Sequence, residues 1–208
     1  MKDPREALCT LGRSLFERGL THGSTGNLSL RVAEGFLLTP TGVSLGTLEP
    51  GRLALLDPQG VHVSGDPPTK EAALHLAMYR ERPQDCAVVH LHATHSVAVS
   101  VLEETNAQDA LPPLTAYYAM RIGRLPVLPY YAPGDAALAA AVGEAATSHH
   151  ALLLANHGPV VSGKTLAIAA DAIEELEATA ALWLKVRHDK VRALTHAQCD
   201  DLSRRFPR

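Results

Sequence analysis

The chain has few aromatic residues and no strong excess of charge of either sign, and both absences limit its partners. Aromatic side chains make up 4% of the 208 residues, too few for the stacking surfaces that bind single-stranded nucleic acid. The formal net charge is −3, so no broad positive field faces a phosphate backbone. We therefore expect no nucleic-acid partner.

Cysteine is equally scarce, and the sequence has no long hydrophobic run. Cys9, Cys86 and Cys199 are odd in number and far apart, as is typical of reduced thiols rather than a disulfide framework. No apolar stretch approaches the ~20 residues that span a bilayer, and the charged N-terminus shows no export signal. These features predict a cytoplasmic protein without a membrane partner.

The sequence does contain enough apolar material for one sizeable domain. Hydrophobic residues make up 46% and charged residues 20% of the chain, ordinary values for a folded globular protein. A length of 208 residues suits a single domain, and no linker or internal repeat interrupts it. We therefore expect one domain over residues 1–208.

Hydrophobic periodicity alternates between helical and strand patterns along the chain. Helices are predicted over about 5–18, 70–82, 135–147 and 165–190, with a part-helical segment over 111–121. Strands are predicted over about 28–32, 35–38, 53–56, 61–63, 87–92, 125–131, 151–155 and 160–161. Prolines inside 125–131 indicate an edge strand, because proline cannot donate to a sheet ladder.

Two histidines stand two residues apart at the end of the predicted strand 87–92. Side chains alternate between the faces of a strand, so His90 and His92 point the same way. Val89 and Leu91 point to the opposite face and can pack in the core. Such a histidine pair supplies half of a zinc site, although a polar strand end is the commoner explanation when the pair stands alone.

A third histidine follows another apolar strand. His157 lies in the corner Asn156-His157-Gly158, a typical place for a site residue on a rigid support. Three imidazoles with an open position are the arrangement of a catalytic zinc. Glu71 is the nearby carboxylate, though acidic residues are common in first helical turns because of the helix dipole. His95 could compete as a ligand, but we interpret it as a loop or helix-cap residue.

Two turns rich in glycine, threonine and small polar residues could hold a small anion. The first lies within 20–30 and the second is Thr39-Pro40-Thr41-Gly42, each next to a predicted strand. Glycine lets a backbone approach closely, and exposed N–H groups suit an anion. Ordinary surface turns are the alternative explanation, and neither turn matches a nucleotide-binding motif.

Four short motifs therefore follow one another along the chain. They are Gly26-Asn27-Leu28-Ser29, Thr39-Pro40-Thr41-Gly42, Glu71 with His90-Leu91-His92, and Ala155-Asn156-His157-Gly158. In this order they resemble the class II aldolase/adducin family of sugar-phosphate enzymes, over about the whole chain. The resemblance implies an α/β fold, a three-layer α/β/α sandwich with a largely antiparallel central sheet. It also implies a homotetramer with active sites at subunit interfaces.

The same resemblance implies roles for individual residues. One Zn²⁺ per subunit, or another divalent metal, would be bound, with Glu71 as acid/base and occasional fourth ligand. The implied metal ligands are His90, His92, His157 and Glu71. The implied residues around the substrate and its phosphate are Gly26, Asn27, Thr41, Gly42, Thr69 and Lys70.

The chain departs from the aldolases and epimerases next to Glu71. Thr69-Lys70 stands where the family's aldolases have two serines, and the epimerases have an aspartate in place of Glu71. With the later segment 111–118, the run Pro68-Thr69-Lys70-Glu71 resembles the branch that decarboxylates 3-oxo-tetronate 4-phosphates. A cation at Lys70 could orient a substrate carboxylate, and an exposed lysine at a helix start is an equal alternative.

The resemblance thus implies a metal-dependent carbon–carbon lyase of carbohydrate metabolism. A 3-oxo-tetronate 4-phosphate, a small phosphorylated sugar acid, would lose CO₂ through a metal-stabilised enediolate and give dihydroxyacetone phosphate. Glu71 would supply the proton, and Tyr117 or Tyr118 could act as a second acid or simply pack. The alternatives are a fuculose-phosphate type aldolase, a ribulose-phosphate 4-epimerase and a metal-free interaction module like the adducin head. The retained ligand set argues against the last of these.

Overall fold

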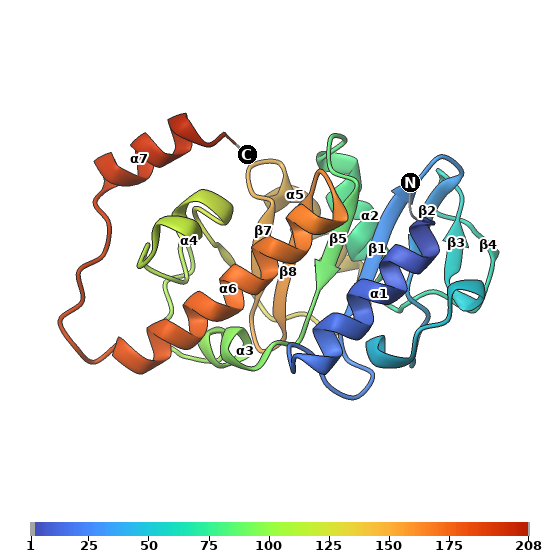
Figure 1. Cartoon of the computed structure of the whole chain (residues 1–208), viewed down its shortest axis with the longest axis horizontal. Helices are drawn as coiled ribbons and strands as arrows, with labels where there is room; N and C mark the ends of the chain where they lie inside the picture. The colour runs from blue at the N-terminus through green and yellow to red at the C-terminus, as the bar shows by residue number, and fades with distance from the viewer. Residues whose placement is uncertain (1–2, 208) are drawn as a thin grey trace.

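The computed structural model describes residues 3–207 and is built around one eight-stranded sheet (Figure 1). The strand order is β4-β3-β2-β1-β5-β8-β7-β6, and all neighbours are antiparallel except β6 and β7. The strands are β1 (Asn27–Val32), β2 (Gly35–Leu38), β3 (Ala54–Leu56), β4 (His62–Ser64), β5 (Ala87–His90), β6 (Val127–Leu128), β7 (Ala151–Leu154) and β8 (Gly158–Gly163). The largely antiparallel sheet is confirmed, and β6 lies at its edge as predicted.

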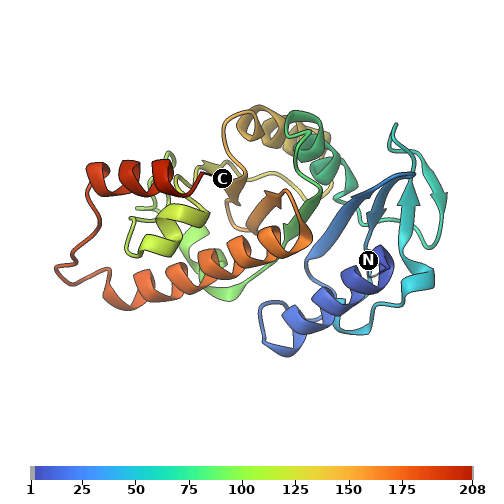
Figure 2. The same ribbon diagram turned by 45° about the horizontal axis from the view of Figure 1, so that its top comes forward.

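Helices cover both faces of the sheet and complete the three layers expected from the sequence (Figure 1; Figure 2). The helices are α1 (Pro4–Glu17), α2 (Ala72–Glu81), α3 (Thr94–Ser100), α4 (Ala116–Arg121), α5 (Ala136–Ala146), α6 (Leu166–Val186) and α7 (His196–Arg205). α1, α3, α4 and α6 lie on one side of the sheet, and α2 and α5 pack together on the other.

Successive residues of the central strands belong to two cores, one on each face of the sheet. On β5, Val89 packs on the α6 side and Val88 packs on the α2 side. Leu153 and Leu152 of β7 repeat this alternation. Complete burial stabilises a valine or leucine side chain by about 1.5–3 kcal/mol, so helices on both faces contribute to stability.

Side-chain caps set where the helices begin. The Asp3 carboxylate accepts the Arg5 N–H at 2.9 Å before α1, and the Thr165 hydroxyl accepts the Ile168 N–H at 3.2 Å before α6. Gly19 has φ of 73° just after α1, where a residue without Cβ can adopt the left-handed conformation. These caps explain why both helices begin within two residues of the predicted positions.

Several boundaries differ from the prediction, for local reasons. β5 ends at His90, because the chain turns after Leu91 into α3, so His92 lies just beyond the strand. α2 begins at Ala72, which makes Glu71 its N-cap residue rather than part of its first turn. The sequence did not predict α3, which is short and rich in β-branched residues, or α7, which has no buried residue. The predicted helix over 165–190 corresponds to α6, which ends at Val186, and α7 lies beyond it.

No helix in the part of the chain from residue 3 to residue 207 is both long and apolar enough to cross a membrane.

Candidate functional site

Four predicted site residues from distant parts of the sequence converge beside the end of β5. Glu71, His90, His92 and His157 each offer a ligand atom, and these atoms all lie within 4.8 Å of one another. Three of the residues are buried and His92 is partly buried. We call this group the Glu/His cluster.

The sheet brings the histidines together. β5 lies between β1 and β8, and in this register His90 stands beside Asn27 on one side and Val160 on the other. His157 lies in the corner between β7 and β8, which follow each other antiparallel. His90 and His157 are 67 residues apart in the sequence, so only the sheet register makes them neighbours.

A strained corner holds His157 in place. Asn156 has φ of 57°, a left-handed conformation that asparagine tolerates better than most residues. Gly158 has φ of 150°, and a Cβ atom there would lie 2.3 Å from the Leu91 carbonyl oxygen. Glycine is therefore required at this position for β8 to approach the segment that carries His92.

The Nε2 atoms of the three imidazoles lie close to one another. The His90 Nδ1 lies 2.9 Å from the Pro159 carbonyl oxygen, which can only accept, so Nδ1 carries the proton and Nε2 is free to coordinate. The His157 Nε2 lies 3.3 Å from the His90 Nε2 and 3.1 Å from the His92 Nε2. Two nitrogens bound tetrahedrally to one zinc at about 2.0–2.1 Å would stand about 3.3 Å apart, so these rings fit a metal ion.

The two carboxylate oxygens of Glu71 have different partners. Oε2 accepts the Asn27 side-chain N–H at 2.9 Å and lies 3.3 Å from the His90 Nε2. Oε1 lies 3.3 Å from the His157 Nε2 but has no hydrogen-bond partner among residues 3–207, although it is buried. A buried oxygen left without a hydrogen bond is unusual, and a metal ion or a substrate proton would satisfy it.

The pKa shifts of Glu71, His92 and His157 favour the charge states that attract a cation. Burial alone would raise the pKa of Glu71, but the His90 side chain and the Asn27 hydrogen bond together hold it below its ordinary value. Burial, reinforced by the neighbouring histidines, lowers the pKa of His92 to about 3. Burial and His90 lower the pKa of His157 to about 4. A carboxylate beside neutral imidazoles at His92 and His157 suits a metal ion, so the cluster could hold one.

Hydrogen bonds tie together the segments that carry the predicted substrate-binding residues. The Thr39 N–H donates to the Leu28 carbonyl at 3.0 Å, and the Thr69 N–H donates to the Thr39 carbonyl at 3.1 Å. The Thr41 N–H donates to the Pro67 carbonyl at 3.0 Å. The start of β1, the turn at 39–42 and the segment before α2 therefore lie side by side.

These segments place some predicted residues against the cluster and others on the open surface. Asn27 bonds directly to Glu71, and a Cβ atom at Gly26 would lie 3.0 Å from the His90 carbonyl oxygen. The Thr69 hydroxyl accepts the Glu71 N–H at 3.3 Å. The residues exposed beyond them are Thr41, Gly42 and Lys70. Asn27 and Thr69 are therefore buried beside the cluster, whereas Thr41, Gly42 and Lys70 are exposed at the surface.

The two tyrosines of α4 have opposite environments, and neither belongs to the Glu/His cluster. Tyr118 is fully buried in the core on the α6 side of the sheet. Tyr117 is 59% exposed, with the Arg121 guanidinium 5.3 Å from the centre of its ring. The helix α4 therefore exposes Tyr117 at the surface, while Tyr118 packs in the core.

His95 also stands apart from the cluster. It lies in the first turn of α3, where Glu177 accepts both its backbone N–H, at 2.8 Å, and its Nδ1, at 2.7 Å. His95 was interpreted as a loop or helix-cap residue, whereas it lies inside the first turn of α3, two residues after the N-cap Ala93.

One buried histidine close to Glu71 was missed by the sequence analysis. His75 lies one turn after Glu71 and contacts Ser29 and Asn27. A histidine four residues after a candidate catalytic glutamate, on the same face of a helix, is the signal that could have pointed to it.

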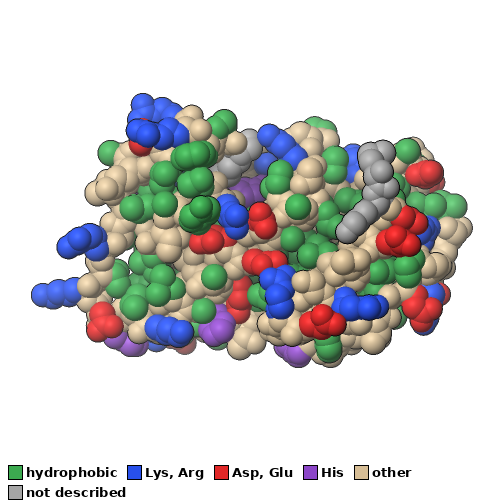
Figure 3. Space-filling model, in the orientation of Figure 1, with side chains coloured by type: hydrophobic (Ala, Val, Ile, Leu, Met, Phe, Trp, Pro, Cys, Tyr) green, Lys and Arg blue, Asp and Glu red, His purple; other side chains and the backbone are tan. Residues whose placement is uncertain are grey.

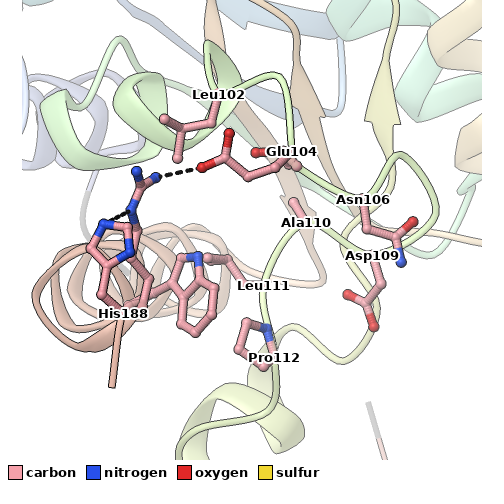
Figure 4. Close-up of a pocket in the computed structure, with 11 residues that line it drawn as sticks. Leu102, Glu104, Asn106, Asp109, Ala110, Leu111, Pro112 and His188 are labelled. Carbon is pink, nitrogen blue, oxygen red and sulfur yellow. Dashed lines mark hydrogen bonds and ion pairs between the residues drawn. The ribbon is translucent and has the colours of Figure 1, made fainter. Parts of the chain in front are cut away.

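A separate groove of about 510 Å³ lies between the C-terminal end of α6 and the segment 102–112 (Figure 4). There the Arg187 guanidinium forms an ion pair with Glu104 at 3.0 Å and a hydrogen bond with the His188 ring. The described residues that line this groove include no member of the Glu/His cluster. The groove is therefore not part of the candidate site.

Sequence comparison relates the chain to proteins named 3-oxo-tetronate 4-phosphate decarboxylase and L-fuculose phosphate aldolase. The chain is 46% identical over 202 residues to a 3-oxo-tetronate 4-phosphate decarboxylase of Haemophilus influenzae, covering 97% of this chain and 96% of that protein. It is 48% identical over 200 residues to the Pectobacterium atrosepticum protein of that name, covering 96% and 92%. The L-fuculose phosphate aldolase of Escherichia coli is more distant, at 35% identity over 167 residues, with coverage of 80% and 75%.

Structure and family comparisons agree with the sequence relatives. The crystal structure of YgbL from Escherichia coli matches with a TM-score of 0.93 at 44% identity, covering 95% of this chain and 96% of that one. Residues 6–184 match the model of the Class II Aldolase and Adducin N-terminal domain. The chain therefore belongs to the class II aldolase and adducin family.

Proposed function

We propose that this protein decarboxylates a 3-oxo-tetronate 4-phosphate to dihydroxyacetone phosphate and CO₂. The observation that carries the proposal is Glu71, a buried carboxylate aimed at three converging imidazoles, with Thr69-Lys70 before it instead of two serines. The relatives at 46% and 48% identity carry this activity in their names, whereas the fuculose phosphate aldolase is 35% identical.

The proposed cofactor is one Zn²⁺ per subunit, or another divalent metal, held by the three histidines with Glu71 as occasional ligand. Neutral imidazoles and the unsatisfied Oε1 of Glu71 support this assignment. When bound, the metal supplies a Lewis acid beside the oxo group of the substrate. A divalent ion other than zinc would serve the same chemistry.

The chain's own residues bind the substrate and move a proton. We assign the phosphate to Gly26, Asn27, Thr41 and Gly42, and the carboxylate to Lys70, with Thr69 between them. Loss of CO₂ breaks the C1–C2 bond and leaves its electron pair on C2, next to the oxo carbon. The Glu71 carboxylate takes up a proton and passes it to C2. That proton comes ultimately from water, because the net reaction consumes one proton per CO₂.

We further propose that one cytoplasmic domain spans residues 1–208 and assembles as a homotetramer with sites at the interfaces. Exposed apolar side chains support the assembly, and Figure 3 shows hydrophobic side chains gathered over α4 and the adjoining parts of α6 and α7. The exposed large apolar side chains on these helices or at their ends include Tyr117, Leu182 and Phe206. Tyr117 is the tyrosine that could act as a second acid in a neighbouring site. Light scattering should give a mass of four chains, and a monomer in solution would contradict the assembly.

The decisive experiment is a product assay with the metal-loaded protein. Incubation with 3-oxo-tetronate 4-phosphate should release CO₂ and dihydroxyacetone phosphate in equal amounts. Fuculose 1-phosphate serves as the competing substrate. Inertness towards the oxo-acid, together with cleavage of fuculose 1-phosphate, would show an aldolase instead. Purified protein that neither contains nor binds a divalent metal would exclude both enzymes and favour an interaction module.

A further inference from the structure

A chain of buried hydrogen bonds runs beneath the Glu/His cluster and ends on Glu71. The Tyr79 hydroxyl lies 2.8 Å from the Ser29 Oγ, which lies 2.7 Å from the His75 Nδ1. The His75 Nε2 contacts the Asn27 Oδ1, and the Asn27 Nδ2 donates to the Glu71 Oε2 at 2.9 Å. All five residues are buried.

Proton counting fixes the direction of every bond in this chain. The Glu71 carboxylate can only accept, so the Asn27 amide must turn its NH₂ towards it and its oxygen towards His75. That oxygen also only accepts, so the His75 Nε2 must carry the ring proton. The His75 Nδ1 then accepts the Ser29 hydroxyl proton, and Ser29 in turn accepts from Tyr79.

His75 is held in the neutral state that this pattern requires. Its side chain is fully buried, which opposes a positive charge on the ring. Ser29 fixes the ring from the opposite side, on the neighbouring strand β1. A single neutral tautomer is therefore built into the contact between α2 and β1.

We propose that His75 is a positioning residue for Glu71, because its Nε2–H fixes the Asn27 amide in the one orientation that donates to the Glu71 Oε2. Without this donor the amide can rotate and present its oxygen to the carboxylate, which repels it. His75 thus keeps the Glu71 Oε2 hydrogen-bonded to Asn27, while the Glu71 Oε1 faces the reacting centre. The inference rests on the proposed role of Glu71 as the acid/base.

Three substitutions at His75 separate positioning from packing. Gln can place an amide N–H near the position of Nε2, Asn reaches only the position of Nδ1, and Leu has no polar atom. We expect His75→Gln to keep kcat within about threefold, and His75→Asn and His75→Leu to lose about 10–100-fold with KM little changed, as for other supporting hydrogen bonds. Metal content should remain stoichiometric in all three. Equal losses in all three variants, or no loss in any, would overturn the proposal.

A neutron crystal structure of the full-length wild-type protein tests the inference without substrate and without any variant. We expect deuterium on the His75 Nε2 and both amide deuterons of Asn27 on the side of Glu71. Deuterium on the Nδ1 alone, or the Asn27 oxygen facing Glu71, would refute it. A wild-type protein inert towards 3-oxo-tetronate 4-phosphate would reject the proposed function and leave this result standing.

Discussion

Glu71 combines one restrained oxygen and one unrestrained oxygen in a site that excludes most of the solvent. Oε2 is held by Asn27, while Oε1 faces the histidines without a hydrogen bond among the described residues. A carboxylate arranged in this way can bind a cation or transfer a proton through Oε1 without moving its backbone. The two oxygens therefore serve different purposes.

Replacement of this carboxylate should separate turnover from metal binding. We expect Glu71→Gln to lower kcat by about 10²–10⁴-fold, the usual contribution of a general acid or base, while the three imidazoles retain the metal. CO₂ release and metal content are the measurements. Glu34→Gln, an exposed glutamate between β1 and β2, is the matched control and should be unchanged. A fully active Glu71→Gln variant would remove Glu71 from the reaction.

Replacement of a ligand histidine should instead weaken metal binding. We expect His157→Ala to weaken metal affinity by more than the roughly 10–100-fold that loss of an outer hydrogen bond costs. Competition with a chelator measures the change. His95→Ala is the control, because His95 bonds to Glu177 outside the cluster and should leave metal affinity intact. Loss of metal from the His95 variant instead would reassign the ligand set.

The corner between β7 and β8 is the backbone device that places His157. Substitution Gly158→Ala forces a Cβ atom to 2.3 Å from the Leu91 carbonyl oxygen at a φ of 150°. We expect a loss of about 1–3 kcal/mol in the free energy of unfolding and a clear fall in metal affinity. Gly51→Ala is the control, since nothing lies within 4 Å of its added Cβ atom. Urea denaturation measures the free energy of unfolding, and chelator competition measures the metal affinity. Equal values for the two variants would show that Gly158 does not position His157.

The start of α3 depends on a carboxylate from another helix. Glu177 of α6 accepts the backbone N–H groups of His95 and Ser96, both at 2.8 Å, and the Ser96 hydroxyl at 2.6 Å. We expect Glu177→Ala to cost about 2–3 kcal/mol, since these bonds go to a largely buried charge at a helix N-terminus.

A neighbouring glutamate on the same helix provides the comparison. Glu174 pairs with Arg18 at 2.6 Å, but both side chains are partly exposed. Glu174→Ala should therefore cost at most about 1 kcal/mol. Urea denaturation of the two variants tests the difference, and an equal loss of stability would show that Glu177 does not anchor α3.

The whole molecule should become less stable in mild acid when its metal is removed. Burial lowers the pKa of His75 and His92 to about 3 and that of His157 to about 4. These values lie below the ordinary histidine pKa, so the unfolded chain takes up protons first as the pH falls. The stabilisation is complete above about pH 6.5 and is lost as the pH falls towards the folded values.

The change in the free energy of unfolding per pH unit is the measurable quantity. Each such histidine contributes about 1.4 kcal/mol per pH unit below about pH 6.5, so the free energy of unfolding should fall more steeply than one group allows. Urea denaturation of chelator-treated protein between pH 8 and 5.5 measures it. His75→Gln removes one titrating group and should make the slope shallower. A stability that does not change over this range would contradict the burial of neutral histidines.

Local sequence patterns predicted most of the helices and strands and the candidate metal ligands. Period-two and helical patterns of apolar residues predicted the strands and the main helices, because each pattern matches one buried face. His90, His92 and His157 could be proposed because each lies at or just after an apolar strand. α3 escaped prediction, since a seven-residue helix with β-branched residues has almost no local signal.

The tertiary structure alone decided which polar groups meet. The β1–β5 register puts Asn27 beside His90, and the packing of α2 against β1 puts His75 beneath Asn27. On the other face of the sheet, the packing of α4 against α6 buries Tyr118 and leaves Tyr117 exposed, although the two are adjacent in sequence. Hydrogen bonds between residues more than forty positions apart depend on strand register and helix packing, and no local pattern encodes either. The residue types in the site were readable from the sequence, whereas their mutual orientation required the fold.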